Sequence, residues 1–187
     1  MRPALAILFA MAPLGAQMAR PVPAAAPVAA SLQTEPTRVS LAALAKISRG
    51  FDHDFQTFAP ADPVDLLGRT RGIYLEGFGV VFTTELSPIL TPQVSPFRAT
   101  VDAEETAKVR QRKLERLPAV QRLMNSMLVS AARELAALPD DQQIVVAVKF
   151  LYLSSEDTTG LPGQMVLQAS RRAVLSGAPI QAMVANQ

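Results

Sequence analysis

The sequence predicts an α+β domain: a small antiparallel sheet of about four strands, in the order α-β-β-α-β-β, packed against two helices. Residues 143–153 form an almost uninterrupted apolar run that suits a central strand, because its side chains alternate between two faces. Residues 102–138 carry apolar side chains every three to five positions, which predicts a long helix. Short connections between neighbouring strands favour antiparallel pairing, with the helices gathered on one face.

The first helix is expected at residues 40–58. Ser40 is suited to cap its start, Gly50 weakens its middle and Pro60 ends it. Its apolar positions recur at three- and four-residue spacing: Leu41, Leu44, Ile47, Phe51, Phe55 and Phe58.

Residues 73–86 predict two strands joined by a tight turn at Glu76 and Gly77. The alternative is a single strand in which Gly77 and Gly79 mark a bulge or a closely packed helix. Three prolines, Pro88, Pro92 and Pro96, make the segment that follows irregular.

The long helix of residues 102–138 contains Pro118, which predicts either a kink or a break with Pro118 in the first turn of a second helix. After the central strand and a polar loop at 154–163, residues 165–169 predict a strand that returns antiparallel to it. Ser170 then caps a short helix that Gly177 closes.

The central strand is apolar on both faces, which is typical of a strand covered on both sides. Either the helix at 40–58 covers the second face, or another chain does. The second possibility is the main reason to expect a protein partner or a homo-oligomer.

The N-terminus has the pattern of an export signal. Residues 1–19 combine a basic start, a short apolar run and small residues, and cleavage is possible as late as residue 30. Residues 20–38 are rich in Ala and Pro and predict an extended linker, so the domain occupies 39–187. The expected location is the periplasm or the exterior, and an uncleaved leader that anchors the chain to a membrane is the competing interpretation.

Composition excludes several classes of function. Hydrophobic residues make up 49% of the 187 and charged residues 18%, which is typical of a globular domain. The absence of cysteine excludes disulfides, thiolate metal sites and a cysteine nucleophile. The net charge of +2 comes from Arg2 and Arg20 in the leader, so the domain lacks the basic excess that nucleic-acid binding requires.

His53 is the only histidine, so a catalytic triad or a histidine metal site must use it. Its neighbours Asp52 and Asp54 point about 100° away along a helix and cannot converge with it on one ion. An enzyme at His53 would use carboxylates among Asp52, Asp54, Glu156 and Asp157, and it requires the loop at 154–163 to fold over the first helix. A solvated helix face is the alternative for His53, and a plain turn is the alternative for the acidic loop.

Two further charged features have ordinary structural explanations. Lys149 lies inside the apolar strand, where its stem packs and its ammonium reaches the sheet edge or pairs across strands with Glu85. The long helix is rich in basic residues, but acidic residues interleave with them, which favours a solvated outer face over a lipid-binding one. These basic residues are Lys108, Arg110, Arg112, Lys113, Arg116 and Arg122.

No residue is therefore assigned a catalytic, cofactor-binding or metal-binding role. The leading hypothesis is an exported, non-enzymatic domain that binds protein or has a structural role in the cell envelope. The alternatives are a hydrolase or metal-dependent enzyme around His53, and a membrane-surface module held by its leader.

Overall fold

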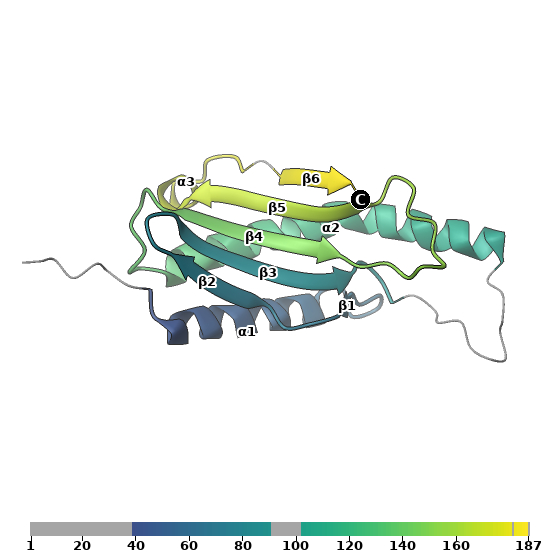
Figure 1. Cartoon of the computed structure of the whole chain (residues 1–187), viewed down its shortest axis with the longest axis horizontal. Helices are drawn as coiled ribbons and strands as arrows, with labels where there is room; N and C mark the ends of the chain where they lie inside the picture. The colour runs from purple at the N-terminus through teal and green to yellow at the C-terminus, as the bar shows by residue number, and fades with distance from the viewer. Residues whose placement is uncertain (1–38, 91–101, 181, 187) are drawn as a thin grey trace, which may run out of the picture. The chain divides into compact units, whose positions relative to one another are not determined.

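A computed structural model of the protein describes residues 39–90, 102–180 and 182–186 (Figure 1). All of these residues belong to one compact unit, Glu35–Gln187. The predicted signal peptide at 1–19 and the linker at 20–38 lie outside the described residues.

The described chain alternates between helices and strands. In order, the elements are α1 (Leu41–Thr57), β1 (Asp65–Leu66), β2 (Arg71–Leu75), β3 (Gly79–Ser87), α2 (Ala103–Glu134), β4 (Gln143–Phe150), β5 (Pro162–Ser170), α3 (Arg171–Leu175) and β6 (Ala182–Asn186). The predicted α+β class is confirmed.

The six strands form one mixed, mostly antiparallel sheet. The order is β1-β3-β4-β5-β6, and β2 pairs with β3 along the same edge as β1. All pairs are antiparallel except β3 and β4, whose parallel register runs from Gly79 opposite Gln143 to Leu86 opposite Phe150. The parallel pair and the short strands β1 and β6 go beyond the prediction. A parallel pair needs a long crossover, which the segment containing α2 supplies.

The predicted start of the first helix is confirmed. The Ser40 hydroxyl oxygen accepts a 3.1 Å hydrogen bond from the N–H of Ala43 and so caps α1, which ends at Thr57, ahead of Pro60. The cap predicted at Ser170 is also present, since its hydroxyl accepts from the N–H of Ala173 at the start of α3.

The tight turn at Glu76 and Gly77 is confirmed, and the single-strand alternative is wrong. Gly77 has a φ of 76°, and the Phe78 N–H donates a 3.1 Å hydrogen bond to the Leu75 carbonyl. Because φ is positive at this position, glycine suits the turn between β2 and β3.

The long helix continues through Pro118, so the predicted break there is wrong. Pro118 has no N–H to donate to the carbonyl four residues earlier, but the helical bonds on either side keep α2 intact. The buried residues of α2 face the sheet and carry most of the core on this side: Val120, Met124, Met127, Leu128, Ala131 and Ala132.

Both long helices pack against one buried core: in the view of Figure 1, α2 lies behind the strands and α1 runs below β2. The ring of Phe51 on α1 meets the ring of Phe82 on β3 edge to face, with centroids 5.0 Å apart. Phe82 belongs to the same buried cluster as Met124 and Leu128 of α2. The first helix therefore does not cover the second face of the central strand, and that expectation is wrong.

Candidate binding surface at the β2 edge of the sheet

The face of the sheet opposite α1 and α2 has no described helix over it (Figure 1). Strand alternation places Val145, Ala147 and Lys149 of β4 on this face, because Ile144, Val146 and Val148 point into the core cluster. Val145 is nevertheless buried, at 6% exposed. Ile73 of β2 and Met183 of β6 lie on the same face, and each is 54% exposed.

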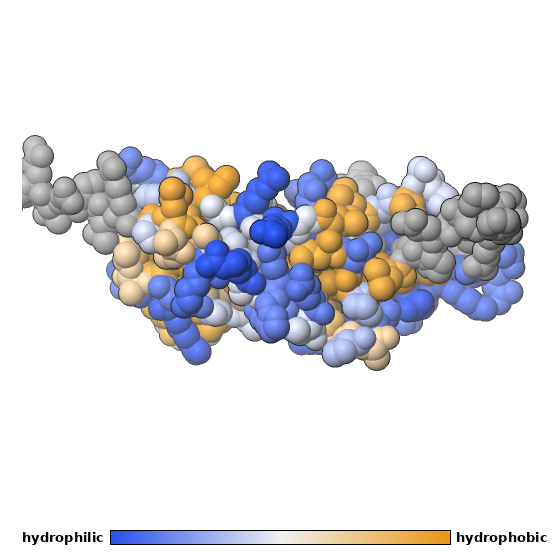
Figure 2. All heavy atoms as spheres, turned by 90° about the horizontal axis from the view of Figure 1, so that it is seen from below, coloured by the Kyte–Doolittle hydropathy of each residue, from blue (hydrophilic) through white to orange (hydrophobic). Residues whose placement is uncertain are grey.

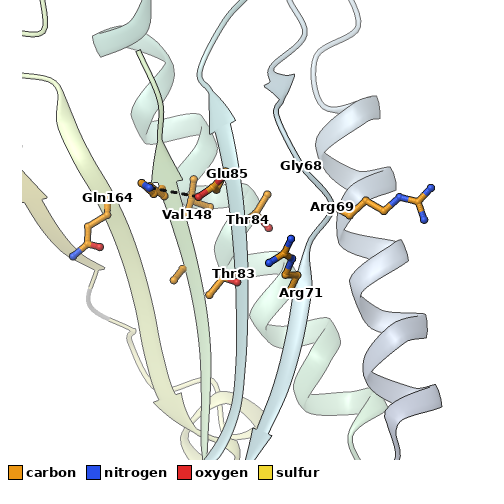
Figure 3. A pocket seen from close by; sticks show the side chains of 10 residues that line it. Gly68, Arg69, Arg71, Thr83, Thr84, Glu85, Val148 and Gln164 are labelled. Atoms are coloured by element: carbon orange, nitrogen blue, oxygen red, sulfur yellow. Dashed lines mark hydrogen bonds and ion pairs between the residues drawn. The ribbon is translucent and has the colours of Figure 1, made fainter. Parts of the chain in front are cut away.

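A shallow hollow of about 370 Å³ lies on this open face. Figure 3 shows its lining, which comes from β2 to β5 and from the bend that precedes β2. Within it, Lys149 Nζ lies 3.5 Å from a carboxylate oxygen of Glu85, directly across the β3–β4 register. The predicted pair is confirmed, and because both side chains are more than half exposed its contribution to stability is small.

A second groove, of about 390 Å³, lies between α1 and β2. Arg69 and Arg71 line this groove as well as the hollow on the open face, so the bend before β2 separates the two. The helix α1 approaches β2 closely at Gly72. A Cβ added to Gly72 would lie 3.2 Å from the Ser48 hydroxyl oxygen. Figure 2 shows the molecule from below, where hydrophilic side chains separate groups of hydrophobic ones.

Two hydrogen bonds hold the bend in place. The Thr70 N–H donates to Asp52 Oδ1 on α1 over 2.7 Å, and the Thr70 hydroxyl shares a 2.8 Å hydrogen bond with the Thr84 hydroxyl of β3. Both threonines are buried. Since Thr70 is fixed to helix and sheet, the flanking Arg69 and Arg71 project from an anchored piece of backbone.

The arginines of this groove have no carboxylate partners among the described residues. Arg49, Arg69 and Arg71 line it, and within the described ranges none of them forms an ion pair. Other cations have carboxylate partners: Lys46 with Glu134, Lys108 with Glu104, Arg110 with Asp157, Arg112 with Asp62, Lys113 with Glu156, Lys149 with Glu85 and Arg171 with Asp140. Within the described ranges Arg116, Arg122, Arg133 and Arg172 also lack an ion pair, but none of them lines this groove. Among the described residues that line the groove, Asp52 has the only carboxylate, and it accepts a hydrogen bond from the Thr70 N–H.

The residues considered for an enzyme site are held by different partners. His53 is exposed on α1, and Asp52 bonds to Thr70 at the start of β2. Burial raises the pKa of the Asp54 carboxyl, and the neighbouring charge of His53 partly opposes this rise.

Glu156 and Asp157 instead face α2, where they pair with Lys113 and Arg110. The loop that carries them is thus bonded to α2, whereas an enzyme at His53 needs it to cover α1. No group of three or more His, Asp or Glu side chains in the described part of the chain could hold a metal.

Lys113 was expected on a solvated face, and that expectation is wrong. Its side chain is fully buried, its ammonium pairs with Glu156, and Nζ lies 5.0 Å from the ring centroid of Tyr152. The sequence did contain a signal for this burial, because Lys113 falls four residues after the buried Val109 and seven before the buried Val120, on the apolar stripe of α2.

Other cations of α2 are also neutralised, by Glu104, Asp62 and Asp157. Arg116, Arg122 and Arg133 of α2 have no ion pair within the described ranges, so only part of the positive charge of the helix is neutralised. None of the helices within the described ranges is long and apolar enough to cross a membrane.

Comparison of the chain with protein-family models, with curated proteins and with solved structures gave no match in any of the three.

Proposed function

We propose that this chain is an exported, non-enzymatic binding domain, and that the groove between α1 and β2 receives an acidic, extended segment of another protein. The observation that carries the proposal is that Arg49, Arg69 and Arg71 all line one groove and have no carboxylate partners in the described chain. A guanidinium group donates two parallel hydrogen bonds to a carboxylate, so three of them in one groove favour an acidic partner.

The backbone of β2 supports an extended partner. Among the described strands β2 pairs only with β3, so the edge that borders the groove has no strand beside it. An edge strand leaves alternate N–H and C=O groups available to an added strand. Strand addition of this kind gives affinity through the main chain and specificity through side-chain contacts.

Apolar side chains supply the remaining contact area. Leu41 at the start of α1 is 83% exposed, and Leu75 at the end of β2 is 46% exposed. Leu41 lines the groove itself, whereas Leu75 lies with Arg71 on the open face of β2. An acidic segment with alternating apolar side chains matches this combination of charge and hydrophobic area.

Fluorescence anisotropy with labelled peptides tests the proposal. A peptide of alternating Glu and Val should bind the purified chain saturably and more weakly at high salt, whereas the same peptide with Lys in place of Glu should not bind. The double variant Arg69→Glu/Arg71→Glu should weaken binding at least about tenfold, since each charge-assisted hydrogen bond is worth about 1.5–3 kcal/mol.

Arg122→Glu is the matched control, because Arg122 is an exposed arginine of α2 outside the groove. Equal loss of binding in the control, or absence of saturable binding by the Glu peptide, contradicts the proposal.

A second copy of the chain is the other candidate partner, and the exposed Ile73 and Met183 on the open face favour it. Light scattering of the purified chain decides between the two. A dimer mass that Met183→Glu reduces to a monomer mass supports a homo-oligomer through the open face. Export has its own test, because the intact mass of secreted protein should lack residues 1–19 or 1–30.

A further inference from the structure

A small cavity lies at the carboxyl ends of the parallel strands β3 and β4, away from the groove described above. Its volume is about 90 Å³, more than one water molecule needs. Asp65 of β1 and Ser87 of β3 lie opposite each other in the β1–β3 register and line it. Glu156, from the loop that follows β4, lines it as well.

Glu156 has one oxygen in use and one without a partner. Its side chain is only 7% exposed, and Oε2 accepts a hydrogen bond from the buried ammonium of Lys113. Oε1 is buried and has no hydrogen-bond partner within the described residues. A buried carboxylate oxygen without a donor is destabilising, so a donor supplied from outside the chain would stabilise it.

The other polar groups of the cavity also accept rather than donate. The Ser87 hydroxyl donates its proton to the Ile89 carbonyl over 2.9 Å, so its remaining capacity is as an acceptor. The Tyr152 hydroxyl likewise donates to the Pro162 carbonyl over 2.8 Å. Asp65 has no ion pair among the residues that the structure describes. Because the acceptors have no spare donor among them, an anion does not fit.

The charge of the cavity and its apolar lining restrict the class of ligand further. Lys113 neutralises Glu156, so Asp65 leaves a single negative charge at the cavity. Apolar side chains complete the lining, and Leu67 and Leu153 are 48% and 41% exposed at its mouth. A single ammonium group on an aliphatic stem satisfies the acceptors, balances the charge and contacts the leucines.

We infer that this cavity binds a primary alkylammonium group, contributed by a small amine or by a lysine side chain of another protein. The inference rests on Glu156, Asp65 and Ser87 and is independent of the function proposed for the groove.

Methyl NMR on the full chain tests this inference, with n-butylammonium as the probe. Butylammonium should cause saturable shifts of the Leu67, Leu151 and Leu153 methyl signals, and butanol and butyrate should not. Asp65→Asn should weaken the binding at least about tenfold, because a charge-assisted hydrogen bond is lost. Asp141→Asn, at an exposed carboxylate in the turn before β4, should leave it unchanged.

N-acetyl-lysine methylamide distinguishes the two sources of the ammonium. Binding of this compound as tight as that of butylammonium indicates a lysine of a protein, and binding of butylammonium alone indicates a small amine. The inference is overturned if butylammonium gives no saturable shifts, if butanol gives the same shifts, or if Asp65→Asn binds as tightly as the unchanged chain.

Discussion

Asp52 on α1 accepts a 2.7 Å hydrogen bond from the backbone N–H of Thr70, eighteen residues further along the chain. This bond joins the helix to the bend from which Arg69 and Arg71 project. Because Thr70 is buried, its N–H would lack a partner without the Asp52 carboxylate.

Asp52→Ala should therefore lower the free energy of unfolding by about 1–3 kcal/mol, the range for a buried group left unpaired. Urea denaturation followed by circular dichroism measures the change. Asp52→Asn retains a carbonyl acceptor and should recover part of the loss. If the alanine variant is as stable as the unchanged chain, the bond does not hold the bend.

The buried pair of Lys113 and Glu156 predicts a large difference between single and double variants. Lys113→Met leaves Glu156 as an uncompensated buried charge and should cost about 3–5 kcal/mol of stability. Replacing both, with Lys113→Met and Glu156→Leu, should restore most of it, since apolar replacements of a buried pair are often neutral or stabilising. Chemical denaturation of the three proteins checks this, and a double variant no more stable than the single one contradicts it.

Gly79, at the start of β3, should tolerate no side chain. Its φ is 136°, and a Cβ there would lie 2.0 Å from the backbone carbonyl oxygen of Gln143. Gly79→Ala must then displace β4, and thermal unfolding should show a marked loss of stability. Gly50→Ala is the matched control, because Gly50 lies in the middle of α1 with nothing within 4 Å, and it should stabilise the chain by about 1 kcal/mol.

Asp157 predicts a pH-dependent contribution. Hydrogen bonds from Thr159 lower the pKa of the Asp157 carboxyl below its usual 3.8, and the charge of Arg110 adds to the effect. A lowered folded-state pKa stabilises the fold above the unfolded pKa, and this stabilisation is lost as pH falls through the folded value. Asp157→Asn should thus reduce stability at pH 7 and have less effect near pH 3. Chemical denaturation at pH 7 and at pH 3 measures the free energy of unfolding of both proteins. If Asp157→Asn lowers this free energy equally at both pH values, the ionised Asp157 carboxylate is not the source of the stability.

The spacing of apolar residues along the chain was sufficient to predict the helices and the hairpins. Apolar residues at three- and four-residue spacing after Ser40 predicted α1. Side chains that alternate between two faces around Val146 and Val148 predicted β4. The two-residue strand β1 has no periodicity to detect, because a pattern needs several residues. The parallel pairing of β3 with β4 depends on a crossover through α2, which no local signal encodes.

The groove was not predictable for a related reason. Arg49 lies on α1, twenty residues before Arg69 in the sequence, and only the packing of α1 against β2 brings them to one groove. The sequence pattern points to His53 and to the acidic loop, because unusual residues are close together along the chain there. Arginines spread over separate elements give no such signal.

The parallel neighbours Glu85 and Lys149 are sixty-four residues apart in the chain, so the middle of the sheet closes late in folding. Before β4 pairs with it, β3 has only the short strands β1 and β2 as neighbours, and its other edge has no hydrogen-bonded strand. Pairings of such high contact order form slowly and leave nascent strands open to misassociation. A chain that stops before Gln143 would carry that bare edge permanently, and truncations there are expected to aggregate rather than to fold.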